Sequence, residues 1–243
     1  MADIPNRDGV EAQIARAIAK LSGAQMDKLL SQLGNPPRVD NVPASFWREY
    51  GNELRALLEP LLRRLYVEQA GRLGADVGRS RIDWALVNES AATWARDYTF
   101  DLVKGVIDTA RGSVDTNLQT LLREAVAGGF EDSLTNAQIA ERLTAAFGPA
   151  RAEMIAVTET TRAAAAGEMA VVAQLKEGGV TMRAAWNTSE DELVCSICEP
   201  LDGVHENAGG GWTSPTTGET IDAPPAHPYC RCFLTHTLAG GDA

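Results

Sequence analysis

Long apolar runs are missing from this sequence of 243 residues. A membrane-spanning helix needs about 20 consecutive, mainly apolar residues, and no stretch approaches that length. The opening residues, MADIPNRDGV, also lack the basic and apolar regions of a secretory signal. These absences predict a soluble protein that is made in the cytosol and has no membrane partner.

Positive charge is scarce as well, because 22 Lys and Arg stand against 33 Asp and Glu. The deficit is largest in residues 151–243, which carry 5 basic and 13 acidic side chains. An acidic surface repels phosphate backbones, so DNA binding would need a local basic face. One arginine-rich stretch comes close, but its interleaved acids favour solvated helix faces. Its members are Arg55, Arg63, Arg64, Arg72, Arg79 and Arg81.

The sequence patterns of common catalytic sites are absent: it has no Gly-rich phosphate loop, no Ser/His/Asp order and no nucleophile elbow. A carboxylate pair of Glu159 with Asp191 or Glu192 is conceivable, but no spacing requires it. Charged residues on a long helix usually form its solvated face, where Glu159 and Arg162 can pair as i, i+3 neighbours. The sequence therefore predicts a protein that is not an enzyme.

Apolar residues at three- and four-residue spacings fill the first part of the chain, as in amphipathic helices. Residues 35–43 contain three prolines and are expected to form a linker. Pro60 is expected to kink or divide the second helix. Thr135 and Gln138 have the spacing of a capping box. The predicted helices cover about 8–34, 45–73, 82–110, 113–127 and 136–147.

A further long helix is predicted from Pro149 to the paired glycines Gly178 and Gly179. Beyond it the helical period disappears, and short strands are expected at TMRAAWNTS, ELVC and CRCFLTHTL. The loop from Glu206 to Ala226 is long for a small domain and needs a clamp. These features predict an α+β protein with two domains. Residues 1–148 form a helical arm or bundle, and residues 149–243 form a small α+β module with a metal-clamped β and loop lobe.

All four cysteines of the sequence lie close together near its C-terminal end. In the reducing cytosol such a cluster is more often a set of metal ligands than two disulfides. Cys195 and Cys198 have the two-residue gap that lets both thiolates of a tight turn reach one ion. His227, Cys230 and Cys232 supply the second half of a tetrahedral site.

Five candidate ligands thus compete for four positions. If Cys230 and Cys232 begin a strand, their side chains fall on one face and both sulfurs could turn toward the ion. His227 competes for the same position across the turn at Pro228. One of the five is expected to hydrogen-bond a bound thiolate instead of the metal.

A structural zinc ion would also explain how a glycine-rich, acidic lobe folds. Such a segment buries too little apolar surface to offset its conformational entropy, and structural zinc contributes on the order of 10 kcal/mol. Four protein ligands leave no open position for water, which favours a structural role over catalysis. Reduced cysteines without metal, disulfides and a catalytic metal are the alternatives.

The remaining two histidines and two tryptophans are expected to have structural roles. His205 lies in a Gly-flanked turn and His236 on the terminal strand, so both are expected at surface or edge positions. A small domain that lacks large aliphatic residues usually uses tryptophan as core. Trp186 and Trp212 are therefore expected to be buried.

Three segments together resemble the C-terminal domain of the phage Mu F-like head morphogenesis family, also called minor head or minor capsid proteins. They are AEMIAVTETTRAAAAG, AAWNTSEDELVCSICEPLDG and PPAHPYCRC. The four cysteines, His227 and the Thr158–Glu159 pair match the family's pattern. Ser196 stands where such motifs commonly have proline, and Ala165–Ala166 replaces an aromatic–Asn pair before Gly167.

The resemblance implies a low-copy structural component of the virion head, assembled in the host bacterial cytoplasm at or near the portal vertex. Its expected partners are the portal protein and other capsid or head proteins. Some relatives accompany or bind DNA, so a packaging or ejection protein associated with the packaged DNA is the alternative. A zinc-dependent nuclease that uses His227 and His205 beside the metal is less favoured.

Overall fold

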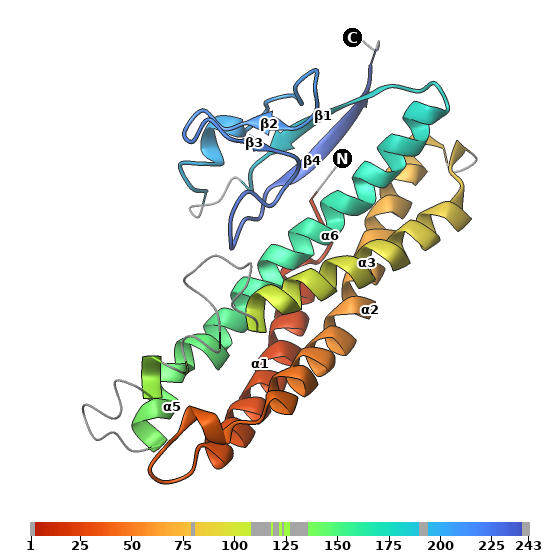
Figure 1. The fold of residues 1–243 in the computed structure, drawn as a ribbon. Helices are drawn as coiled ribbons and strands as arrows, with labels where there is room; N and C mark the ends of the chain where they lie inside the picture. The colour runs from red at the N-terminus through yellow and green to blue at the C-terminus, as the bar shows by residue number, and fades with distance from the viewer. Residues whose placement is uncertain are drawn as a thin grey trace. The chain divides into compact units, whose positions relative to one another are not determined.

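A computed structural model of the chain describes residues 3–78, 81–107, 118, 122, 124–126, 136–189 and 194–239. Within these ranges it is mainly helical, with a small β region near the C-terminus (Figure 1). The expected α+β fold is confirmed. In the described part of the chain, no helix is both long and apolar enough to cross a membrane.

The contacts divide the chain into two compact units, and each is described by itself. Unit 1 consists of Met1–Glu11, Leu61–Trp94 and Met154–Ala243, and unit 2 of Ala12–Pro60 and Ala95–Glu153. Both units are therefore assembled from segments far apart in the sequence. The domain boundary expected near residue 148 remains a prediction.

The predicted helices are found where the structure describes them. They are α1 (Arg7–Leu33), α2 (Ala44–Val77), α3 (Trp84–Ile107), α5 (Asn136–Phe147) and α6 (Pro149–Glu177). The linker contains a short 3-10 turn, Val39–Asn41. The described residues of the predicted 113–127 helix are helical. Residues 108–110 and the Thr135 cap lie outside the described residues. Helix α2 is not divided at Pro60 but continues through it, because apolar side chains along its whole length are packed.

Unit 2 is held by the apolar faces of its helices and by a few polar links. Tyr50 of α2 stacks on Phe147 of α5 with ring centroids 5.9 Å apart. Its hydroxyl group is 2.9 Å from that of Ser22 in α1. Lys28 of α1 pairs with Glu49 of α2 at 2.8 Å on the surface. These contacts connect three helices around one buried aromatic residue.

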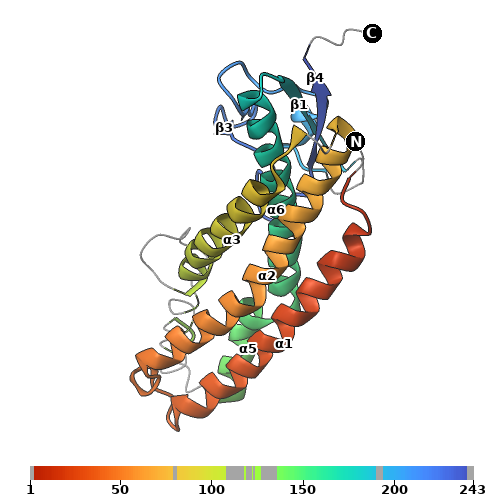
Figure 2. The ribbon, with the colours of Figure 1, turned by 90° about the vertical axis from the view of Figure 1, so that its right-hand side faces the viewer.

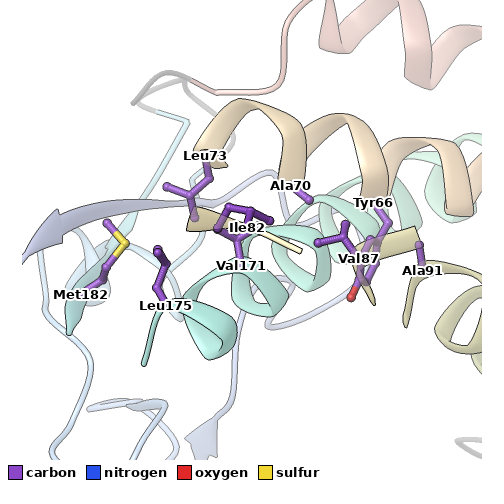
Figure 3. Close-up of a cluster of buried hydrophobic side chains, with 9 residues drawn as sticks. All are labelled: Tyr66, Ala70, Leu73, Ile82, Val87, Ala91, Val171, Leu175 and Met182. Carbon is purple, nitrogen blue, oxygen red and sulfur yellow. The ribbon is translucent and has the colours of Figure 1, made fainter. Parts of the chain in front are cut away.

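In unit 1, one apolar cluster joins α2, α3, α6 and the first strand (Figure 3). Its buried members are Tyr66, Ala70, Leu73, Ile82, Val87, Ala91, Val171, Leu175 and Met182. Helices α2 and α6 approach closely where Gly167 faces the carbonyl oxygen of Tyr66. Helix α6 ends in a Schellman motif, because Gly179 has a φ of 79° and Val180 N–H donates to the Leu175 carbonyl oxygen.

Beyond this cap lie four short strands. Strands β1 (Met182–Asn187) and β4 (Phe233–Leu238) lie side by side and pair antiparallel (Figure 2). Trp186 lies opposite Leu234. The segment from Gly203 to Glu206 bonds the other edge of β1. Along β1, the alternate residues Met182, Ala184 and Trp186 are buried, as expected for a strand with one face on a core.

Three expectations for this lobe need correction or fall outside the described residues. The presumed Glu206–Ala226 loop contains a two-stranded hairpin of β2 (Trp212–Thr213) and β3 (Thr220–Ile221). Of the predicted ELVC strand, the described residues Val194 and Cys195 are not in a strand. Strand β4 begins at Phe233, so Cys230 and Cys232 precede it. The carbonyl oxygens of Cys230 and Arg231 accept hydrogen bonds from Thr161 and Arg7 instead of from a neighbouring strand.

Candidate metal centre

Cys195 and Cys198 lie on one tight turn. The backbone N–H groups of Cys198 and Glu199 both donate to the carbonyl oxygen of Cys195, at 3.1 and 2.9 Å. Cys198 then leads into a short 3-10 turn, Glu199–Leu201, whose Leu201 is buried. The turn brings both sulfurs to the same side, as their two-residue gap predicts.

The imidazole ring of His227 faces these two sulfurs. Its Nε2 atom lies 3.0 Å from Cys195 Sγ and 3.2 Å from Cys198 Sγ. Its Nδ1 atom is 2.7 Å from the carbonyl oxygen of Pro228. A carbonyl oxygen only accepts hydrogen bonds, so Nδ1 carries the proton and Nε2 presents a lone pair. This tautomer is the one that binds a metal through Nε2.

Cys230 and Cys232 complete the cluster from the chain segment before β4. Cys198 Sγ lies 3.8 Å from Cys230 Sγ, and the thiols of Cys198, Cys230 and Cys232 are almost fully buried. All four cysteines are free thiols. The structure thus brings all five sequence-predicted residues together. They form two groups that could each hold a metal ion, Cys195–Cys198–His227 and Cys198–Cys230–Cys232, which share Cys198.

The distances in the cluster suit a small tetrahedral ion. Two sulfurs bound at about 2.3 Å to tetrahedral zinc lie about 3.8 Å apart, which is the Cys198–Cys230 separation. A sulfur and a nitrogen on the same ion are about 3.5 Å apart, so His227 would move outward by a few tenths of an ångström. In the described part of the chain, no carboxylate joins either group. Sulfur and imidazole donors without carboxylates favour zinc over magnesium or calcium.

Two tryptophans cover the buried side of the cluster. Trp186 and Trp212 are fully buried, as predicted, and their rings meet edge to face at 5.5 Å. The indole N–H of Trp212 donates to the carbonyl oxygen of Val204 at 2.8 Å. The indole N–H of Trp186 is buried without a hydrogen-bond partner among the described residues, and its proximity lowers the pKa of the Cys232 thiol slightly. A buried donor directed at sulfur stabilises a thiolate, which is the form that binds metal.

Without a cation, the crowded thiols oppose each other's ionisation. Hydrogen bonds to Cys230 and Cys232, together with burial, raise the pKa of Cys198. The hydrogen bond from Cys198 lowers the pKa of Cys232, but Cys230 and burial outweigh it and the pKa rises to about 12. The hydrogen bond with Cys198 lowers the pKa of Cys230. A bound divalent cation reverses this balance, because it deprotonates coordinating thiols.

Residues 116–235 match the model of a family described as phage Mu protein F-like protein. The C-terminal part of the chain is therefore similar to this family. This range contains all five residues of the cluster, and the resemblance predicted from the sequence is confirmed. Comparison with curated proteins and with solved structures finds no match. The family match supports a role in phage head morphogenesis.

Two threonines of α6 connect the Cys/His cluster to the helix. The backbone N–H of Tyr229, which has a φ of 64°, donates to Thr158 Oγ1 at 3.0 Å. Thr161 Oγ1 donates to the carbonyl oxygen of Cys230 at 2.7 Å. In the sequence, Thr158 stands out only as part of the Thr158–Glu159 pair, and Thr161 does not stand out at all. Their signal in the sequence is weak, because threonine in a helix usually bonds its own backbone.

Two acidic residues of α6 contradict the expected solvated face, and His236 has its expected place on the edge strand β4 but a buried side chain. Glu159 and Glu168 of α6 are 4% exposed and do not lie on a solvated face. Glu159 does pair with Arg162, at 3.3 Å. The side chain of His236 is fully buried, and its Nε2 atom is 3.2 Å from Glu168 Oε2. Each buried carboxylate has a basic partner nearby, which lowers the cost of its burial.

The remaining candidate residues lie apart from the Cys/His cluster or outside the described residues. His205 is exposed, as expected, and belongs to neither group of possible metal ligands. Asp191 and Glu192, the suggested carboxylate partners of Glu159, lie outside the described residues. In the arginine-rich stretch, Arg64 bonds Glu68 and Arg72 bonds Gln69. Glu68 balances the charge of Arg64, whereas the neutral Gln69 leaves that of Arg72 unchanged.

Proposed function

We propose that this chain is a minor head protein that assembles at the portal vertex or the capsid interior, with a structural zinc ion in its C-terminal lobe. The Cys/His cluster inside the Mu F-like region carries the proposal, since it combines the family match with a donor set suited to zinc. The helical part would supply the surface that docks on the portal oligomer. The zinc lobe would act as its rigid head.

Four residues would hold the ion: Cys195, Cys198, His227 and Cys230. Cys198 belongs to both groups of candidate ligands, and its distance to Cys230 suits a shared tetrahedral ion. The fifth residue, Cys232, would hydrogen-bond a bound thiolate. Four protein ligands leave no site for a reacting water molecule, so the ion would supply rigidity and no chemistry.

Elemental analysis of protein purified without a histidine tag tests the zinc proposal. One zinc per chain, with thiols that react only after denaturing chelation, is the expected result. Freely reactive thiols in a protein without metal would remove the zinc ion from the proposal. Thiol titration on the same sample gives the number of protected cysteines.

Binding to purified portal oligomers tests the assembly role. Co-sedimentation with the portal oligomer, without hydrolysis of DNA, is the expected result. A chain that leaves the portal unbound but binds duplex DNA, with an affinity that falls steeply with salt, would favour the DNA-associated alternative. The salt series therefore separates the two partners.

A further inference from the structure

A buried arginine at the start of α1 contacts the part of the chain after α6 that carries the Cys/His cluster, called here the metal lobe. Arg7 is only 4% exposed. One of its terminal nitrogens, Nη1, lies 2.7 Å from the carbonyl oxygen of Arg231, between Cys230 and Cys232. The other, Nη2, donates to Thr161 Oγ1. Since Thr161 in turn donates to the carbonyl oxygen of Cys230, Arg7 reaches both peptide groups of the Cys230–Cys232 turn.

Acidic side chains hold this guanidinium in place from its own segment. Arg7 Nε lies 2.8 Å from Glu11 Oε1, and Nη1 lies 2.8 Å from Asp3 Oδ1. Glu11 is also buried, and its other oxygen is 3.2 Å from Arg231 Nη2. Asp8 pairs with the same arginine nitrogen. Residues 3–11, called here the N-terminal segment, thus bind the metal lobe through Arg7 and through two carboxylates, Asp8 and Glu11, which pair with Arg231.

We infer that Arg7 positions the Cys230–Cys232 turn of the metal centre, so that metal binding in this lobe depends on the docked N-terminal segment. This inference rests on the proposed zinc site. The flat guanidinium group provides several donors in fixed directions, and here it bonds four acceptors at once. A chain of buried hydrogen bonds to the backbone of a ligand holds that ligand's sulfur at one position.

The coupling works in both directions, because each partner is ordered by the other. Metal at Cys230 fixes the carbonyl oxygens that Arg7 binds, and docking of Arg7 fixes the sulfur positions that the metal needs. Loss of the metal should therefore release the N-terminal segment. Loss of Arg7 should accelerate the loss of metal, by at least tenfold, as is usual for residues that orient metal ligands.

The first measurement is the rate of zinc transfer from the full-length protein to a coloured chelator. Arg7→Met and Arg7→Lys are compared with Arg16→Met, which alters an exposed arginine of the same helix. The two Arg7 variants should release zinc at least tenfold faster than the parent, and Arg16→Met at the parental rate. Thr161→Val removes the hydroxyl link without touching Arg7 and should act in the same direction. The spectrum of bound Co²⁺ should shift in the Arg7 and Thr161 variants only.

Trypsin digestion measures the effect of zinc on the N-terminal segment. The buried Arg7 should resist cleavage in the zinc-bound protein and become a cleavage site when zinc is removed. Zinc release and Co²⁺ spectra equal to those of Arg16→Met in all three variants would overturn the inference while leaving the zinc site intact. If the parent binds no zinc, the zinc proposal fails separately. In that case the reactivity of the Cys230 and Cys232 thiols tests the positioning role of Arg7. Higher reactivity in Arg7→Met than in Arg16→Met supports this role, and equal reactivity contradicts it.

Discussion

Gly167 of α6 lies directly against the carbonyl oxygen of Tyr66 in α2: a Cβ atom built on this glycine would be 2.1 Å from that oxygen. Backbone cannot yield to such a contact without moving one helix away from the other. The close approach belongs to the packing that joins α2, α6 and the first strand in unit 1. It explains why a glycine occupies the middle of a long helix, where it is otherwise unfavourable.

Gly167→Ala should therefore destabilise the protein by about 3 kcal/mol or more, because the new methyl group forces the helices apart. Gly71→Ala provides the matched control, since nothing lies within 4 Å of a Cβ at that helical position. There alanine should stabilise by about 0.5–1 kcal/mol. Urea unfolding followed by circular dichroism gives both values. Equal stability of the two variants would show that α2 and α6 do not meet at Gly167.

Single cysteine substitutions should distinguish the cysteines that bind zinc from the one that only hydrogen-bonds a ligand. Cys198→Ser and Cys230→Ser are expected to abolish stoichiometric zinc binding, because each removes a proposed ligand. Cys232→Ser should keep one zinc per chain, since a serine hydroxyl can still hydrogen-bond a thiolate. Metal content after dialysis is the measurement, with Ser196→Ala, an exposed position on the same turn, as control. Loss of zinc from Cys232→Ser with retention in Cys230→Ser would reverse the assignment.

Trp186→Phe should weaken zinc binding by about tenfold through loss of the indole N–H that faces Cys232. Trp212→Phe is the matched control, because its N–H bonds a backbone carbonyl oxygen and no sulfur. It should lower stability without changing zinc affinity. Competition titrations with a chelator of known affinity measure the effect. The idea fails if both variants lose affinity equally.

Zinc affinity should rise with pH. Hydrogen bonds to Cys230 and Cys232, together with burial, raise the pKa of the proposed ligand Cys198, so at neutral pH this thiol holds its proton in the metal-free protein. Every thiol that becomes a ligand must release its proton, and acid competes with the metal for the sulfur. Calorimetry in buffers of different ionisation enthalpy counts the protons released. Binding without proton release would contradict a thiolate site.

The buried Glu168 should make stability depend on pH. Burial raises the pKa of its carboxyl group, although the hydrogen bond and charge of His236 and the charge of Arg72 oppose the shift. The folded state then holds a proton that the unfolded state releases above about pH 4.5. The contribution of Glu168 to stability is thus greatest below that pH and declines as pH rises through the raised pKa.

Glu168→Gln should remove this decline, because glutamine keeps a polar side chain between Gln69 and His236 without ionising. Its unfolding free energy relative to the parent should increase with pH above the ordinary glutamate range. Glu89→Gln, an exposed site on α3, should leave the pH profile unchanged. Parallel profiles for all three proteins would show that Glu168 does not titrate in this range.

The sequence predicted the elements that local patterns determine. Helix α6 begins at Pro149 and ends at Glu177, just before the paired glycines, as expected, since proline and glycine act on their own backbone. The cysteine spacings likewise predicted the cluster. Buried polar residues were missed, because Glu168 and Arg7 look like solvated charges until distant partners are known. His236 and Thr161 are, respectively, 68 and 154 residues away from these two.

Unit 1 also constrains the order in which the chain can fold during its synthesis. The N-terminal segment is synthesised before the rest of unit 1, yet Arg231, which Arg7 contacts, lies 224 residues later in the chain. Until the final β-strand has emerged, the helices of this unit expose the apolar faces that the lobe will cover, and such nascent chains are prone to aggregate. A ribosome that stalls before Cys230 would therefore leave Arg7 without its contact to Arg231 and the apolar faces of unit 1 exposed.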